Sequence, residues 1–143
     1  MHIHAIIVGV RAPLPVLARA VKAGFPSPAD DYVDRGIDLN ELLIANRPAT
    51  FLVKVDGDSM VQKGLCDGDL AVVDRSLDPR EGDVVVVDVD GERSFKVWST
   101  VAGRPKLSFA NLRYPAFETS AFAEIEVWGV VCGSVNPRRR AIR

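Results

Sequence analysis

The sequence is poor in residues that bind metals or form disulfides. Its 143 residues include two cysteines and two histidines. Cys66 and Cys132 are far apart and neither belongs to a Cys-x-x-Cys pair, which excludes the usual zinc spacings and a disulfide framework. His2 and His4 have no further ligands nearby in the sequence. We therefore predict no metal, no cofactor and two free thiols, which are typical of a reducing cytoplasm.

The sequence also lacks a long apolar run. No stretch approaches the 18 or so residues that cross a membrane as a helix. Residues 5–10 are apolar, but no Lys or Arg precedes them, and Arg11, Pro13 and Pro15 follow, so they do not form a signal peptide. We expect a cytoplasmic protein that does not bind membranes. Its apolar fraction of 48% is sufficient for a packed core.

The charges are balanced overall but unevenly distributed. The net charge is −1, yet residues 1–22 carry three basic residues and no acidic ones, which leaves −4 on the rest. A cationic arm is suited to an acidic body or a nucleoprotein partner. The last eight residues contain Arg138, Arg139, Arg140 and Arg143, which are compatible with nucleic-acid contact. A disordered, solubilising end is the simpler interpretation, and we expect no sequence-specific DNA binding.

The pattern of prolines, glycines and apolar residues predicts one domain preceded by an arm. Residues 1–23 form the arm, in which Ile3, Ile6 and Val8 suit an extended strand at a sheet edge and residues 16–22 suit one or two helical turns. Residues 24–48 form a linker, extended at its prolines, and a short helix over residues 39–44 that starts at the capping-box-like Asp38-x-x-Glu41. Residues 49–135 form a β domain, and residues 136–143 a basic tail.

Short runs rich in valine and separated by turns predict a mostly β fold. The expected strands are residues 50–55, 69–74, 83–89, 92–98, 106–110 and 126–131. Asp90-Gly91 is a strong signal for a tight turn between the third and fourth of these. The pattern favours a small, curled antiparallel sheet or partial barrel.

Ser59 and Lys96 are candidates for a nucleophile and its base. Ser59 follows the first strand, where it would lie at a strand end, and Lys96 lies in the fourth. A serine hydroxyl needs a neighbouring base, and a neutral lysine can serve without histidine or acid. Neutrality near pH 7 requires the pKa to fall by roughly three units, about 4 kcal/mol, which burial beside Phe95 and Trp98 can supply. The backbone N–H groups of Ser59 and Met60 are candidate oxyanion donors, worth roughly 3 kcal/mol each.

Each residue alone also has a simpler interpretation. Gly57-Asp58-Ser59 suits an ordinary turn, and a lysine in a strand is usually a solvated side chain. The functional interpretation therefore depends on the two residues occurring together within a larger pattern.

Seven short motifs are distributed over residues 23–132. They are Ala23-Gly24-Phe25-Pro26-Ser27-Pro28-Ala29-Asp30-Asp31-Tyr32, Ile37-Asp38-Leu39-Asn40, Gly57-Asp58-Ser59-Met60, Asp67-Gly68-Asp69-Leu70, Gly82-Asp83-Val84-Val85, Asp90-Gly91-Glu92 with Lys96, and Gly129-Val130-Val131. In this order and spacing they resemble the UmuD and LexA group of self-cleaving serine peptidases (peptidase family S24), and UmuD in particular. No single motif is specific, but together they are.

The resemblance implies the roles of specific residues. It makes Ser59 the nucleophile, Lys96 the general base and Ala23–Gly24 the bond that is cut. It implies a β domain of the type found at the C-terminus of LexA. It also implies a homodimer whose cleavage is promoted by a recombinase filament on single-stranded DNA in the SOS response to DNA damage. The product would be an accessory subunit of an error-prone, Y-family translesion polymerase.

Three alternatives accompany this interpretation. A LexA-type repressor needs a DNA-binding domain before the cleavage site, and 22 residues broken by Pro13 and Pro15 do not supply a helix-turn-helix unit. A signal peptidase needs a membrane anchor. A binding module with a silent site remains open, because a motif alone does not establish activity.

Overall fold

The computed structural model describes residues 3–5, 11–18, 20–24 and 35–139. The chain divides into two compact units. The first unit comprises residues 1–6 and 46–143, and the second unit comprises residues 7–45. Each unit is considered by itself below.

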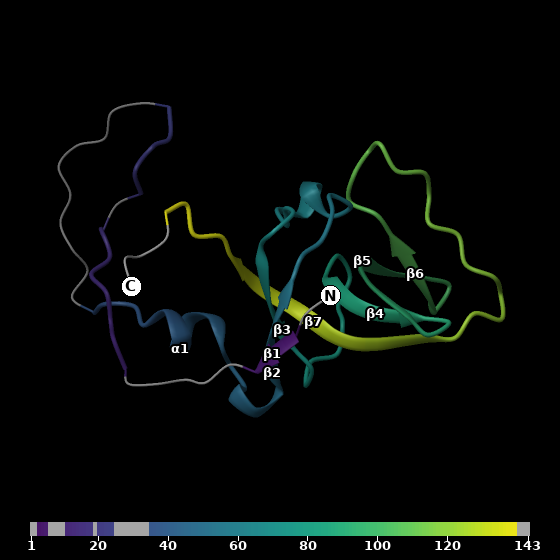
Figure 1. The fold of residues 1–143 in the computed structure, drawn as a ribbon, viewed down its shortest axis with the longest axis horizontal. Coiled ribbons are helices and arrows are strands. Elements are labelled where there is room, and N and C mark those ends of the chain that lie inside the picture. Colours follow the sequence, from purple (N-terminus) through teal and green to yellow (C-terminus); the bar gives the residue numbers. More distant parts are fainter. Residues whose placement is uncertain (1–2, 6–10, 19, 25–34, 140–143) are drawn as a thin grey trace. The chain divides into compact units, whose positions relative to one another are not determined.

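The described part of the first unit is built on one antiparallel sheet of seven strands in the order β1-β2-β3-β7-β4-β5-β6 (Figure 1). The strands are β1 (Ile3–Ala5), β2 (Thr50–Lys54), β3 (Leu70–Asp74), β4 (Val84–Val89), β5 (Glu92–Val101), β6 (Arg104–Ser108) and β7 (Ile125–Val135). The sheet is not closed, because β1 and β6 are its edges. The prediction of a mostly β, antiparallel, incompletely closed fold is confirmed.

The hairpin turns explain how β4, β5 and β6 pair in sequence. Asp90 and Gly91 have φ angles of 49° and 84°, and Val89 pairs with Glu92, as the sequence predicted. A second two-residue turn joins β5 to β6, with φ angles of 53° at Ala102 and 75° at Gly103. Positive φ at both central residues gives the turn whose twist matches that of the strands.

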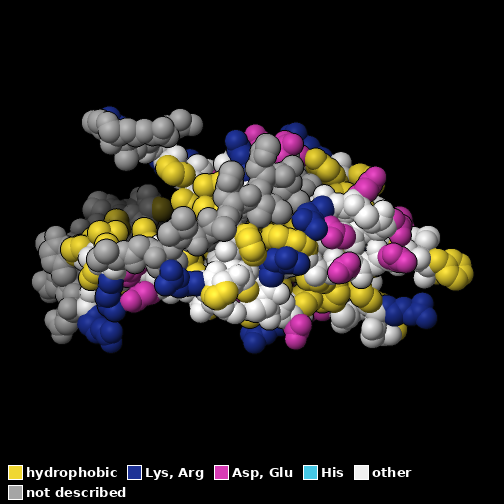
Figure 2. Space-filling model, turned by 60° about the horizontal axis from the view of Figure 1, so that its bottom comes forward, with side chains coloured by type: hydrophobic (Ala, Val, Ile, Leu, Met, Phe, Trp, Pro, Cys, Tyr) yellow, Lys and Arg dark blue, Asp and Glu magenta, His cyan; other side chains and the backbone are white. Residues whose placement is uncertain are grey.

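Both faces of the sheet are covered near its centre. The valines of β4 alternate between two clusters: Val84 and Val86 join one, while Val85 and Val87 join the other. This explains why β4 is a continuous valine run rather than an alternating one. The first cluster also contains Val53, Val55, Met60, Leu65, Ala71, Val73, Phe95 and Ala110. Elsewhere on the surface, acidic, basic and hydrophobic side chains are interspersed over the face in Figure 2.

The sheet register is irregular at two positions along β7. The pairing shifts between Val72 and Val73 of β3 and between Val86 and Val87 of β4. Such bulges bend a strand and increase its twist. Two short 3-10 helices, η1 (Arg47–Ala49) and η2 (Val61–Lys63), precede β2 and follow it.

The second unit contains the short helix α1 (Leu39–Leu43), which Asp38 caps by accepting a hydrogen bond from Asn40 N at 2.8 Å. This confirms the predicted start, while Ile44 lies just beyond the helix as its C-cap. The helical turns expected over residues 16–22 are wrong for the described residues, which are not helical. Ile6 and Val8 lie outside the described residues, whereas Ile3 begins the edge strand β1.

Candidate active site

Ser59 lies in the loop between β2 and β3. Gly57, with a φ of 97°, allows the chain to turn after β2, and its N–H donates to Asp67 Oδ1 at 2.7 Å. The next side chain, Met60, is 1% exposed within the first core cluster. Because Met60 is buried, the backbone directly after the half-buried Ser59 is fixed against the core.

A segment distant in sequence contacts the backbone of this loop. Ala110 N donates to Ser59 O at 2.8 Å. Asn111 Nδ2 donates to Asp58 O at 2.8 Å, and the Tyr114 hydroxyl donates to Asp58 Oδ1 at 2.5 Å. The hydrogen bond to Asp58 raises the pKa of Tyr114, because the protonated phenol is the donor in that bond. These three bonds position the peptide units that flank the candidate nucleophile.

Lys96 lies in β5 and is only 5% exposed. Its Nζ donates to Ser94 Oγ at 2.6 Å and to Phe95 O at 3.3 Å. The rings of Phe109 and Phe117 cover it, with centroids 4.9 and 4.6 Å from Nζ. Burial lowers the pKa of Lys96, because desolvation disfavours the charged form. This is the environment that a lysine base requires.

A cavity of about 220 Å³ opens beside Ser59. Its lining residues are Lys54, Asp56, Ser59, Arg93, Ser94 and Phe95. Ser59 and Ser94 thus border the same space, and Ser94 is bonded to Lys96. Within the described part of the chain, no hydrogen bond joins Ser59 Oγ to Lys96 Nζ directly. The structure therefore places the candidate base next to the cavity through Ser94.

The predicted scissile bond belongs to the second unit. Ala23 and Gly24 are both exposed, and a Cβ atom built on Gly24 would have no atom within 4 Å. Residues 25–34 of the first motif lie outside the described residues.

Comparison with known proteins shows the family of the chain. The sequence model of the Peptidase S24-like family matches residues 15–132. The chain belongs to the S24-like peptidase family. This confirms the resemblance to the UmuD and LexA group that the motifs indicated.

Several relatives align over most of this S24-like chain. Protein SamA of Salmonella typhimurium is 37% identical over 130 residues, which are 91% of this chain and 90% of SamA. Protein ImpA of Escherichia coli is 38% identical over 130 residues, covering 90% and 87% of the two chains. LexA repressor 1 of Xanthomonas campestris is 41% identical over 123 residues, which are 86% of this chain and 60% of the repressor.

Sequence reasoning missed the residues that support the S24-like site. Ser94 is two positions before Lys96, and alternation along a strand places both on one face, so its contact with Lys96 was predictable. Asn111 and Tyr114 act across more than 50 positions of sequence. No local pattern shows such contacts, because they depend on how β6 and the chain after it return to the Ser59 loop.

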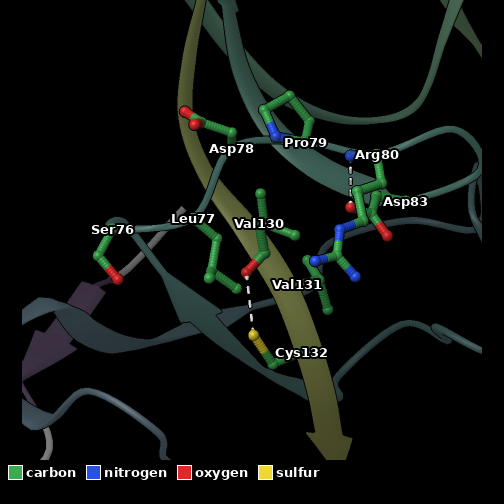
Figure 3. Close-up of a pocket in the computed structure, with 9 residues that line it drawn as sticks. All are labelled: Ser76, Leu77, Asp78, Pro79, Arg80, Asp83, Val130, Val131 and Cys132. Carbon is green, nitrogen blue, oxygen red and sulfur yellow. Dashed lines mark hydrogen bonds between the residues drawn. The ribbon is translucent and has the colours of Figure 1, made fainter.

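A larger cavity of about 730 Å³ lies away from Ser59, between the loop after β3 and strand β7 (Figure 3). It contains none of the predicted site residues. Cys132 lines it and donates from Sγ to Val130 O at 3.7 Å. Desolvation and the negative charge of Asp74 raise the pKa of the Cys132 thiol, which keeps it in the unreactive protonated form.

Metal sites and membrane-spanning helices can also be considered for the described residues. These residues contain no group of three or more His, Cys, Asp or Glu side chains placed to bind a metal ion. None of the helices in this part of the chain is long and apolar enough to cross a membrane.

Proposed function

We propose that the protein is a self-cleaving serine peptidase that cuts its own Ala23–Gly24 bond. Ser59 would be the nucleophile and Lys96 the general base. The observation that carries the proposal is the burial of Lys96 beside the cavity that Ser59 lines. Among the described residues no carboxylate pairs with this amine, so its neutral form is favoured and can accept a proton.

The reaction would proceed in two steps. Ser59 Oγ attacks the carbonyl carbon of Ala23 while Lys96 Nζ takes the hydroxyl proton. The C–N bond then breaks, and Lys96 returns that proton to the departing amine of Gly24, which leaves an ester on Ser59. In the second step Lys96 Nζ takes a proton from a water molecule, whose oxygen attacks the ester carbonyl. The ester C–O bond then breaks and Lys96 returns the proton to Ser59 Oγ, which restores both side chains and leaves Ala23 with a free carboxyl group.

The backbone around Ser59 suits oxyanion stabilisation. In the described structure, the N–H groups of Ser59 and Met60 donate to no protein acceptor, so both are available. The hydrogen bond from Ala110 N to Ser59 O fixes the peptide unit that also contains the N–H group of Met60. Donors positioned before the reaction cost no reorganisation when the negative charge develops, and each is worth roughly 3 kcal/mol.

Ser94 has a supporting role in this proposal. Its hydroxyl oxygen accepts a hydrogen bond of 2.6 Å from Lys96 Nζ and so keeps the amine at the wall of the cavity. In the resting chain the amine donates to Ser94. It would turn to Ser59 when the substrate peptide enters.

The proposed biological role rests on family membership. We propose that the protein acts in the cytoplasm in the SOS response, as a homodimer whose cleavage is promoted by a recombinase filament on single-stranded DNA. The processed form would be an accessory subunit of a Y-family translesion polymerase. Similarity to SamA and ImpA along nearly their whole lengths supports this role. The match to LexA repressor 1, over 60% of that protein, supports the self-cleaving domain that the group shares.

The decisive experiment is the intact mass of the purified chain after incubation at pH 7 and at about pH 10. The wild-type chain should give two fragments, one of which begins at Gly24, and more of them at the higher pH. Ser59→Ala and Lys96→Ala should each remain whole while keeping the circular-dichroism spectrum of the wild type. Continued cutting by either folded variant would remove that residue from the mechanism. An uncut wild-type chain would favour a silent binding module.

A further inference from the structure

One end of the N-terminal arm (residues 1–23) is part of the sheet. Strand β1 pairs antiparallel with β2, where Ile3, His4 and Ala5 lie opposite Val53, Leu52 and Phe51 (Figure 1). β1 is therefore one of the two edge strands of the sheet. It covers backbone groups of β2 that would otherwise face solvent as an open edge.

A second part of the arm is bound within the second unit. Leu14 N donates to Ile37 O at 2.8 Å, and Ile37 N donates to Leu14 O at 2.9 Å. The two backbones lie so close that a Cβ atom on Gly36 would be 2.7 Å from Leu14 O. This is a two-bond antiparallel bridge that forms only where glycine permits the approach.

Two contacts made by the carboxylates of Asp38 and Glu41 hold the arm next to this bridge. Ala12 N donates to Asp38 Oδ2 at 2.7 Å, and Arg11 Nη1 forms an ion pair with Glu41 Oε1 at 2.8 Å. Asp38 is 4% exposed, and the bond from Ala12 is the main cause that lowers its pKa. One carboxylate thus caps α1 and binds the arm.

We infer that cutting at Ala23–Gly24 does not release the arm, which remains bound to the rest of the chain until it is displaced. The inference rests on the cleavage site proposed above. The β1–β2 pairs, the two bonds between Leu14 and Ile37 and the contacts of Arg11 and Ala12 all join a residue before the cut to a residue after it. Two attachments on one peptide are also stronger than either alone, because binding at one raises the effective concentration at the other.

The surface occupied by the arm is therefore a strand-binding surface whose own ligand is residues 1–23. It has two separate parts, which are the edge of β2 in the first unit and, in the second unit, the backbone of Ile37 with the carboxylate of Asp38. The product of cleavage is a nicked complex in which β2 stays covered. Dissociation of the arm is a separate step, and only that step exposes the β2 edge to an extended strand of another molecule.

The test separates retention of the arm from self-cleavage. The chain carries Ser59→Ala, so that it does not cut itself, and has a recognition sequence for an added site-specific protease inserted between the exposed residues Ala23 and Gly24. After complete cutting, native mass spectrometry should show one species with the mass of both pieces, and urea should separate them. Two separate species under native conditions would overturn the inference, whether or not the wild-type chain cuts itself.

Proline variants test the two attachments in the same chain. His4→Pro disrupts pairing with β2, and Leu14→Pro removes the N–H that donates to Ile37. Each should speed dissociation of the arm by about tenfold or more. Ala20→Pro, at an exposed position of the same arm, is the matched control and should dissociate like the parent. Equal rates for all three variants would refute the assigned contacts.

Hydrogen exchange provides a measurement that needs no variant. The amides of β2 that pair with β1, and the amide of Ile37, should be as slow to exchange in the nicked complex as in the whole chain. Fast exchange directly upon cutting would overturn the inference.

Discussion

The two units of this chain are stabilised by different interactions. The first unit buries apolar side chains on both faces of a sheet, including the fully buried Val53, Val85 and Val86. In the described part of the second unit only Asp38 is buried, and the structure depends on backbone bridges and polar contacts. A catalytic geometry requires a rigid frame, while a peptide that is to be cut must open locally at low cost. The unit that contains Ser59 has the packing of a rigid frame, and the unit that contains Ala23–Gly24 has the sparse packing that allows local opening.

The sharpest test of this contrast is Gly24→Val. A β-branched side chain beside the attacked carbonyl should block its entry into the cavity, and we expect cutting to slow by about a hundredfold or more. The thermal midpoint of the first unit should not change, because open space surrounds Gly24. Mass spectrometry against time measures the first quantity and calorimetry the second. Normal cutting of the variant would show that the bond is elsewhere.

A matched pair of glycine substitutions compares how a steric conflict in each unit affects the free energy of unfolding. In Gly129→Ala the new Cβ atom would lie 2.5 Å from Val73 Cγ1, so the sheet must shift and the free energy of unfolding should fall by about 1–3 kcal/mol. In Gly36→Ala the conflict is with Leu14 O, so the arm should loosen while the first unit unfolds at the same urea concentration. Urea titration of both variants in the Ser59→Ala chain gives the comparison. A large loss from Gly36→Ala would contradict the division into units.

The buried amine should be visible in the pH dependence of stability. Burial lowers the pKa of Lys96 in the folded state from the ordinary value of 10.5. Between the lowered folded-state pKa and the ordinary pKa of the unfolded chain, the folded state therefore binds fewer protons than the unfolded state. The free energy of unfolding of the Ser59→Ala chain should therefore rise with pH across that window, relative to the same chain with Lys96→Met. The gain is about 1.4 kcal/mol for each unit of lowering.

Urea midpoints of these two chains between pH 6 and pH 10 measure this difference. Parallel curves would mean that Lys96 is charged in the folded protein. The rate of self-cleavage should follow the same ionisation, rising about tenfold per pH unit below the lowered pKa and levelling above it.

The smallest expected effect concerns the contact between Tyr114 and the loop of Ser59. Tyr114→Phe keeps the ring packed on Phe109 but removes the hydrogen bond to Asp58. We expect a loss of about 1 kcal/mol, seen as cutting that is slower by about fivefold with little change in stability. A rate equal to that of the wild type would show that Asp58 does not position Ser59.

Much of the fold was predictable because local chemistry decides it. Alternating or continuous apolar residues specify β2, β3 and β4, and Asp90-Gly91 has the residues that a turn with positive φ requires. The lengths of β5 and β7 were underestimated, since both continue into partly exposed ends where apolar periodicity fades. The Ala102-Gly103 turn was missed because alanine rarely adopts positive φ.

The site was predictable only in part. The motifs indicated Ser59 and Lys96, and the sequence around Lys96 suggested an apolar setting. The aromatic cover came from elsewhere: Phe109 and Phe117 lie beyond β6 and reach the amine through the fold. Ser94 was within reach of strand periodicity, whereas the bonds from residues 110–114 to the loop required tertiary structure.

The position of β7 determines when the sheet can form. β7 is the last strand in sequence, yet it lies between β3 and β4 in the middle of the sheet. Until the ribosome has released residues 125–135, β3 and β4 each present an unpaired edge, and the sheet consists of two separate pieces. The sheet is therefore completed only when β7 inserts between the two unpaired edges, and chains that end before β7 are left with apolar edges prone to aggregation.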